Sequence, residues 1–123
     1  MENVKYFFDS YSIVELIEGN QSLLPYAEEI ATITIFNLAE IYYVFLNRLG
    51  EEEANEVYMK YKSSVAEIDD ETLKEAIKFR KQHKKQDLSY SDCIGYIYAK
   101  RHGMRFLTGD KEFEKMENVE FIM

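Results

Sequence analysis

The chain has 123 residues, of which 46% are hydrophobic and 31% charged, so it is long enough for one domain with its own core. Its single cysteine, Cys93, excludes an internal disulfide framework and a cysteine-based zinc finger, which fits a reducing compartment. The net charge of −8 argues against a protein that coats nucleic acid through bulk positive charge, but it leaves room for an enzyme that handles phosphates with metal ions.

The organisation of the chain is simple. No apolar run approaches the roughly 20 residues of a membrane span, and the N-terminus lacks the basic-then-apolar layout of a signal peptide. We therefore expect a cytoplasmic protein without a membrane partner. No repeat, low-complexity segment or linker divides the sequence, so we predict a single domain over residues 1–123.

Strand-like and helix-like segments alternate along the chain. Five short apolar or β-branched runs predict buried strands at residues 4–9, 31–36, 64–68, 104–108 and 119–123. Capped or amphipathic segments predict helices at residues 12–19, 23–29, 37–50, 51–63, 70–85, 88–103 and 110–117. Strands that are apolar on both faces and separated by helices predict a parallel sheet covered by helices on both sides.

Helix caps can be assigned from polar residues that precede apolar periodicity. Ser12 and Glu15 have the spacing of a capping box, and Asn37 and Ser89 are predicted as the N-caps of two further helices. In the helix that follows Ser89, the small residue Gly95 lies on the face of Asp92, which predicts that this face packs inward.

Four carboxylates stand at unusual positions in this pattern. Asp9 ends an aromatic strand, Glu40 lies in the first turn of an apolar helix, Asp92 lies three residues after a cap, and Asp110 follows the fourth strand. Each has an ordinary interpretation as a cap, an Asx-turn or a favourable charge at a helix N-terminus. All four nevertheless belong to strand ends or helix starts, and ligand sites of parallel sheets lie outside the carboxyl ends of the strands.

Four carboxylates in one partly buried pocket repel each other unless some are protonated or a cation neutralises them. Oxygen ligands favour Mg²⁺ or Mn²⁺, and such an ion is suited to phosphate esters because it polarises a phosphoryl oxygen and activates a water. We therefore expect Asp9, Asp92 and Asp110 to coordinate the ion, directly or through water. Glu40 would ligate it too or orient the attacking water.

Four sequence pieces in this order, FFDSYS, NLAEIYYVF, LSYSDCIGYIYAKRHG and FLTGDKEFEKM, resemble the PIN-domain family over essentially the whole chain. The resemblance implies a three-layer α/β/α sandwich around a mainly parallel sheet, Mg²⁺- or Mn²⁺-dependent ribonuclease activity on RNA, and a homodimer. Members of this length are usually VapC-like toxins paired with an inhibitory antitoxin protein. The resemblance further implies that Ser10 and Thr108 support the metal site, whereas Glu112 is better explained as a solvent-facing charge.

Other interpretations remain open at this point. A haloacid-dehalogenase-like phosphatase would need a second aspartate where the chain has Tyr11, and a response-regulator receiver would need a phosphoacceptor where Asp69 and Asp70 are better explained as a helix cap. A PIN-like module that binds protein or RNA without catalysis is the main alternative. His83 and His102 are expected to be helix-end residues rather than ligands of zinc.

Overall fold

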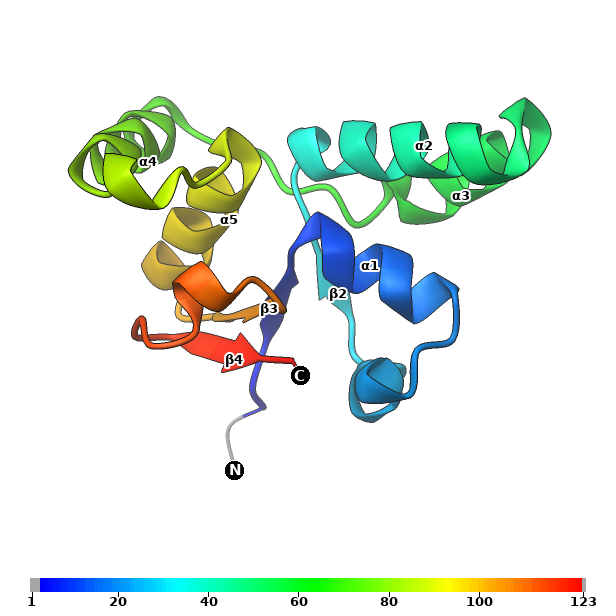
Figure 1. The fold of residues 1–123 in the computed structure, drawn as a ribbon, viewed down its shortest axis with the longest axis horizontal. Coiled ribbons are helices and arrows are strands. Elements are labelled where there is room, and N and C mark those ends of the chain that lie inside the picture. The colour runs from blue at the N-terminus through cyan, green and yellow to red at the C-terminus, as the bar shows by residue number, and fades with distance from the viewer. Residues whose placement is uncertain (1–2, 123) are drawn as a thin grey trace.

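The computed structural model describes residues 3–122, and these form a central four-stranded parallel sheet (Figure 1). The strands follow the order β2-β1-β3-β4, so β1 and β3 occupy the centre. Their bounds are β1 (Tyr6–Phe8), β2 (Ala31–Thr32), β3 (Arg105–Thr108) and β4 (Val119–Phe121). All three neighbouring pairs are parallel, as the strand pattern predicts.

Helices cover both faces of this sheet. The α-helices are α1 (Ser10–Ile17), α2 (Ile35–Leu49), α3 (Glu51–Lys62), α4 (Asp70–Gln82) and α5 (Tyr90–Arg101). Three short 3₁₀ helices join them: η1 (Gln21–Tyr26), η2 (Lys84–Gln86) and η3 (Lys111–Phe113). Figure 1 shows α4 and α5 on one side of the sheet and α1, α2 and α3 on the other. The predicted three-layer α/β/α architecture is therefore confirmed.

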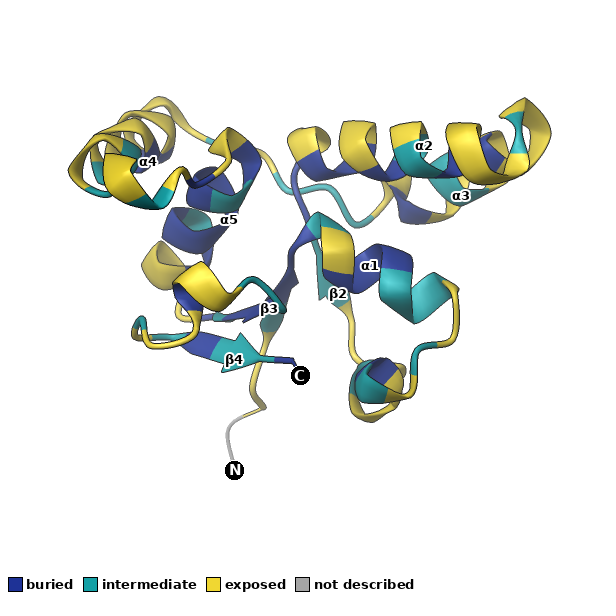
Figure 2. Cartoon of the chain, in the orientation of Figure 1, coloured by how far each residue is buried: buried dark blue, intermediate teal, exposed yellow. Residues whose placement is uncertain are grey.

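Successive strand residues face two separate cores. Phe7 packs with α4 and α5, whereas its neighbour Phe8 packs with α1, α2 and α3. Phe106 and Leu107 divide in the same way on β3. Because side chains alternate across a strand, a strand buried on both faces must be apolar at every position. Figure 2 shows the result: the buried residues gather along the strands and on the sheet-facing sides of the helices.

A close approach of α5 to the sheet depends on Gly95. A Cβ atom at this position would lie 2.5 Å from Cε1 of Phe7 and 3.2 Å from Cε1 of Phe106, closer than packed side chains allow. The predicted inward packing of this helix face is therefore confirmed.

Two predicted strands are shorter or absent. The run 31–36 gives only the two-residue β2, because Thr34 turns out of the sheet and caps α2. Thr34 accepts a hydrogen bond from the backbone of Asn37, and the Asn37 side chain bonds back to the Thr34 backbone. Asn37 is thus the third residue of the helix and not its N-cap. The predicted strand 64–68 is reduced to one parallel bridge between Ile33 and Val65.

The first helix also begins earlier than its sequence suggests. Asp9 is its N-cap and accepts a hydrogen bond from the backbone of Ser12, so the predicted capping box of Ser12 and Glu15 is wrong. Ser89, in contrast, caps α5 as predicted, with its side chain accepting from the backbone of Asp92.

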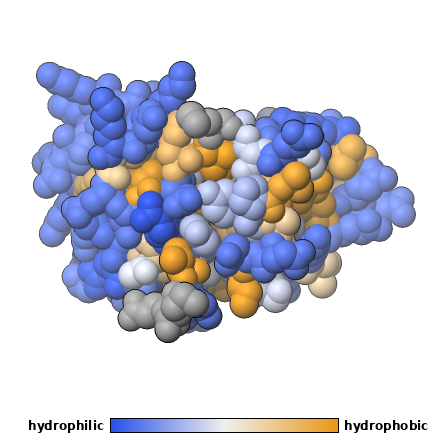
Figure 3. Space-filling view, turned by 90° about the horizontal axis from the view of Figure 1, so that it is seen from below, coloured by the Kyte–Doolittle hydropathy of each residue, from blue (hydrophilic) through white to orange (hydrophobic). Residues whose placement is uncertain are grey.

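Within residues 3–122, no helix has the length and apolar character needed to cross a bilayer. The surface seen from below in Figure 3 is mixed: hydrophilic residues cover both flanks and apolar patches lie between them.

Candidate metal centre

The chain turns toward opposite faces of the sheet after its two central strands, β1 and β3. After β1, the chain continues into α1, whose Ile13 and Val14 pack in the core of one face. After β3, it continues into η3, whose Phe113 packs in the core of the opposite face. The chain therefore leaves adjacent parallel strands in opposite directions, which opens a crevice at their carboxyl ends and is the usual position of ligand sites in α/β sheets.

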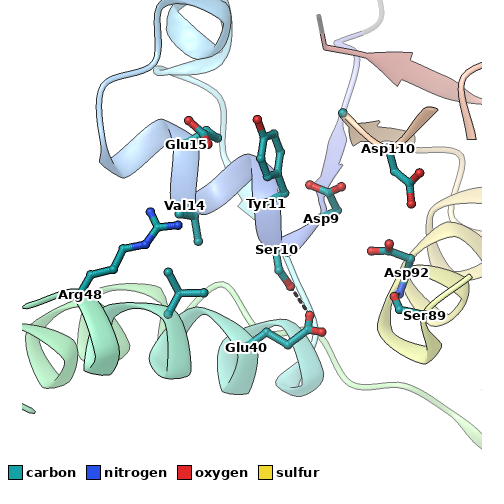
Figure 4. A pocket seen from close by; sticks show the side chains of 12 residues that line it. Asp9, Ser10, Tyr11, Val14, Glu15, Glu40, Arg48, Ser89, Asp92 and Asp110 are labelled. Carbon is teal, nitrogen blue, oxygen red and sulfur yellow. Dashed lines mark hydrogen bonds between the residues drawn. The ribbon is translucent and has the colours of Figure 1, made fainter. Parts of the chain in front are cut away.

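A pocket of about 440 Å³ occupies this crevice, and all four predicted carboxylates line it (Figure 4). They come from four separate segments: Asp9 after β1, Glu40 on α2, Asp92 on α5 and Asp110 after β3. The carboxylates of Asp9, Asp92 and Asp110 face a common space in Figure 4, and Glu40 lies across from them beside Ser10. The structure therefore brings the four predicted residues to one pocket at this edge of the sheet.

Asp9 is held in one orientation by two hydrogen bonds. Its side chain is 3% exposed; Oδ1 accepts from the backbone N–H of Ser12 at 2.7 Å, and Oδ2 accepts from the hydroxyl of Thr108 at 2.6 Å. Burial raises the pKa of Asp9, although the hydrogen bonds from Ser12 and Thr108 act in the opposite direction. Asp9 thus caps α1 and also lines the acidic pocket.

Thr108 links two of the carboxylate positions. Its buried hydroxyl donates to Asp9 and accepts a hydrogen bond of 3.0 Å from the backbone N–H of Asp110. Asp110 in turn caps η3 by accepting from the backbone of Glu112 at 2.9 Å. The ends of β1 and β3 are therefore fixed relative to each other by one side chain.

Glu40 is exposed at the second turn of α2 rather than in its first turn, because the helix begins earlier than predicted. Its Oε1 accepts hydrogen bonds from Ser10 and, at 2.8 Å, from Ser91. The Ser10 hydroxyl also accepts from Nδ2 of Asn37 at 2.9 Å.

Ser91 and Asn37 are therefore site residues that the sequence analysis missed. The only signal for Ser91 was its spacing, because it stands one residue before Asp92 in the capped start of α5. The sequence predicts Asn37 as an N-cap, whereas its side chain accepts a hydrogen bond from the Thr34 backbone and donates one to Ser10.

The carboxyl group of Asp92 lies close to the other three acids of the pocket. Burial together with the negative charges of Asp9, Asp110 and Glu40 raises its pKa to about 7, against a weaker opposing hydrogen bond from Ser89. A carboxyl group with this pKa is half protonated near neutral pH, and the charges of the neighbouring carboxylates add to the effect of burial.

The ion pairs found within residues 3–122 leave these four acids without a cationic partner. Arg48 lines the far end of the pocket, but its guanidinium pairs with Glu18. Oxygen donors with uncompensated negative charge are the set that a hard divalent cation requires. In the same part of the chain, no three His, Cys, Asp or Glu side chains are close enough to form a ready-made cluster. The residues thus fit such an ion by chemistry and charge, and the carboxylates would have to move inward around it.

The other residues considered as possible ligands lie outside the acidic pocket. Glu112 is exposed and accepts a hydrogen bond from Gln86, in agreement with its expected place at the surface. The rings of His83 and His102 each bond through Nδ1 to a backbone carbonyl four residues earlier, as helix-end residues do. Cys93 is buried and free.

Fold and site together define an α/β protein with an acidic pocket at the switch point of a parallel sheet. The PIN-domain family model matches residues 6–119, and the chain belongs to the PIN-domain family. No curated protein sequence matches it closely enough to count as a relative.

Solved structures with the same fold share little sequence with the chain. VapC20 of Mycobacterium tuberculosis, described as a sarcin-ricin loop cleaving toxin, has 15% identity and a TM-score of 0.77, covering 97% of this chain and 100% of its own. A toxin-antitoxin complex from Klebsiella pneumoniae has 16% identity and a TM-score of 0.72, with coverages of 94% and 96%. VapBC2 from Rickettsia felis, bound to a DNA fragment from its promoter, has 14% identity and a TM-score of 0.69, with coverages of 96% and 97%.

Proposed function

We propose that the chain is a Mg²⁺- or Mn²⁺-dependent ribonuclease that hydrolyses phosphodiester bonds of RNA. The observation that carries the proposal is the convergence of four carboxylates, from four segments of a PIN-domain chain, on one pocket where none of them has an ion-pair partner among the described residues. A bound divalent ion would stabilise negative charge on the phosphate and supply an activated water.

Each residue has a part in this proposal. Asp9, Asp92 and Asp110 hold the ion, with Asp9 held in place by the hydroxyl of Thr108. Glu40 is the residue best suited to orient the attacking water, because Ser10 and Ser91 both bond to Oε1 and leave Oε2 for a further contact. Ser10 thus positions Glu40.

We further propose that the protein is the toxin of a VapBC-like pair, inhibited by an antitoxin protein, and that it forms a homodimer. Support comes from the structural neighbours, which include a toxin-antitoxin complex and VapBC2. Large apolar side chains exposed along α2 offer a surface for a protein partner. These are Ile35, Phe36, Tyr43, Leu46 and Leu49.

The test is cleavage of single-stranded RNA by the purified protein with Mn²⁺ and with EDTA. We expect cleavage that requires the metal and that is abolished in Asp9→Asn, which keeps the size and capping ability of the side chain. Glu120→Gln is the matched control, because Glu120 lies on β4 and is paired with Arg105. Equal cleavage by Asp9→Asn and wild type would refute the assignment.

One observation favours a second function, a PIN-like module that binds protein or RNA without catalysis. The described carboxylates do not form a ready-made cluster, as they would in a rigid preformed metal site. The same assay separates the two: RNA that is bound but never cut, with or without Mn²⁺, identifies the module.

A further inference from the structure

A second hollow adjoins the acidic pocket, and the two share Tyr11 and Gly109 as lining residues. This hollow has a volume of about 570 Å³. It mixes apolar with polar side chains, since Leu23, Phe121 and Ile122 line it together with Asn20, Lys111 and Glu114. Its size and mixed lining are those of a small-molecule site, and they leave room for a flat, partly polar ring.

The ring of Tyr11 stands at the boundary between the two hollows. Tyr11 is 54% exposed although it lies at the start of α1, directly after Asp9 and Ser10. In the view of Figure 4, Asp9 lies between the ring of Tyr11 and Asp92. A ligand bound in the acidic pocket can therefore extend past Tyr11 into the second hollow.

Contacts on one side fix this ring without covering it. A Cβ atom at residue 109 would lie 3.1 Å from Cε1 of Tyr11, so the glycine allows the ring to stand against the turn after β3. An aromatic ring that is held on one side and partly exposed is suited to stack on a base.

We propose that the second hollow is a nucleobase subsite, in which the base next to the phosphate held at the acidic pocket stacks on Tyr11. Lys111, exposed at the rim, contacts the backbone phosphate that follows. The inference rests on the proposed action on RNA, and it adds that the chain selects its cleavage site by reading a base beside the cut. Single-stranded RNA is the expected substrate, because a paired base cannot turn out to stack on a side chain.

The direct test measures stacking without cleavage. Short single-stranded RNAs that carry one 2-aminopurine are titrated with protein in EDTA, and the fluorescence of the base is followed. We expect quenching at one position of the RNA with wild type and Tyr11→Phe, and loss of quenching with about tenfold weaker binding in Tyr11→Leu. Tyr90→Leu is the control, because Tyr90 is also exposed but lines neither hollow. Equal quenching by Tyr11→Leu and wild type would overturn the subsite.

Cleavage mapping in Mn²⁺ separates this inference from the proposed function. If wild type cuts and Tyr11→Leu cuts at a broader set of sites, both stand. If the two proteins cut the same sites with the same rates, the ribonuclease remains and the subsite is refuted. If wild type never cuts but its quenching depends on Tyr11, the base site stands and the catalytic assignment fails. Absence of both cutting and binding refutes both.

Discussion

The two ends of the sheet treat their acidic residues in opposite ways. Near the amino ends of β1 and β3, Glu120 accepts a hydrogen bond of 2.8 Å from Arg105 and one of 2.6 Å from the hydroxyl of Tyr26. At the carboxyl ends, Asp9 has an amide and a hydroxyl partner and Asp92 a hydroxyl partner, but neither has a cation among the described residues. The negative charge of Glu120 is compensated within the protein, whereas the charges of the unpaired acids can be compensated only by a cation that binds from solution.

The comparison also shows that hydrogen bonds to a carboxylate do not by themselves compensate its negative charge. Each carboxylate oxygen of Asp9 accepts a hydrogen bond, yet its pKa is still raised because the desolvation of the charged form outweighs these bonds. Within residues 3–122, no buried side-chain oxygen or nitrogen lacks a hydrogen-bond partner. The carboxyl end is therefore well ordered and electrostatically unbalanced at the same time, which is the combination expected of a cation site.

The largest expected effect concerns activity. We expect Asp92→Asn and Asp110→Asn each to lower the rate of RNA cleavage in Mn²⁺ by at least about 100-fold. The double variant should lose little more than either single variant, because groups that hold one ion act as a unit. Initial rates on a labelled RNA measure this. Losses that multiply in the double variant would show that the two carboxylates act independently and would contradict a shared ion.

The next effect is stabilisation by metal. An ion that binds only the folded chain at 100 times its dissociation constant adds about 2.7 kcal/mol to the free energy of unfolding, or about 10 °C in melting temperature. We expect this shift with Mn²⁺ in wild type and Glu120→Gln, and a much smaller shift in Asp92→Asn. A wild-type melting temperature that stays constant up to millimolar Mn²⁺ would favour the non-catalytic module.

A smaller effect is the pH dependence of the metal-free protein. The pKa of Asp92 is about 7 in the folded chain, against an ordinary value of 3.8, so the folded state binds more protons between these values. Its contribution to the free energy of unfolding therefore falls as the pH rises from about 4 to 7 and then levels off. Urea unfolding in EDTA at pH 5 and pH 8 should show that Asp92→Asn is the more stable protein at pH 8, by a margin that shrinks at pH 5. A margin independent of pH would contradict the raised pKa.

The smallest effect is expected at the paired end. Glu120→Gln removes the ionic part of the contact between two partly exposed side chains, Glu120 and Arg105, and weakens the bond from Tyr26. We expect a loss of about 1 kcal/mol in the free energy of unfolding, measured by urea titration, with RNA cleavage unchanged. A large loss of cleavage in this variant would remove the distinction between the two ends of the sheet.

Several parts of this molecule follow from local sequence patterns. Local patterns predict the strand Tyr6–Phe8, the cap at Ser89 and the inward packing of the α5 face that carries Gly95. Each of these signals lies within one turn or one strand. The four carboxylates could also be placed, since strand order decides where Asp9 and Asp110 come together.

Other parts depend on contacts between distant segments. Thr34 looks like one more β-branched strand residue, and only the bond to Asn37 shows that it ends the strand and begins α2. Ser91 gains its place from Glu40, which is 51 residues away in the sequence. The short pairing of Val65 likewise depends on where Ile33 lies and not on its own apolar pattern.

The glycine under α5 sets a dimension of the site that no charged residue controls. Gly95 lies three residues after Asp92 on the same face of the helix, and the ring of Phe7 fills the space that its side chain would need. Any larger residue there would push the start of α5 away from β1 and so carry Asp92 away from Asp9. An uncharged residue thus sets the width of the acidic pocket. A chain could retain every acid and still lose the gap into which an ion fits.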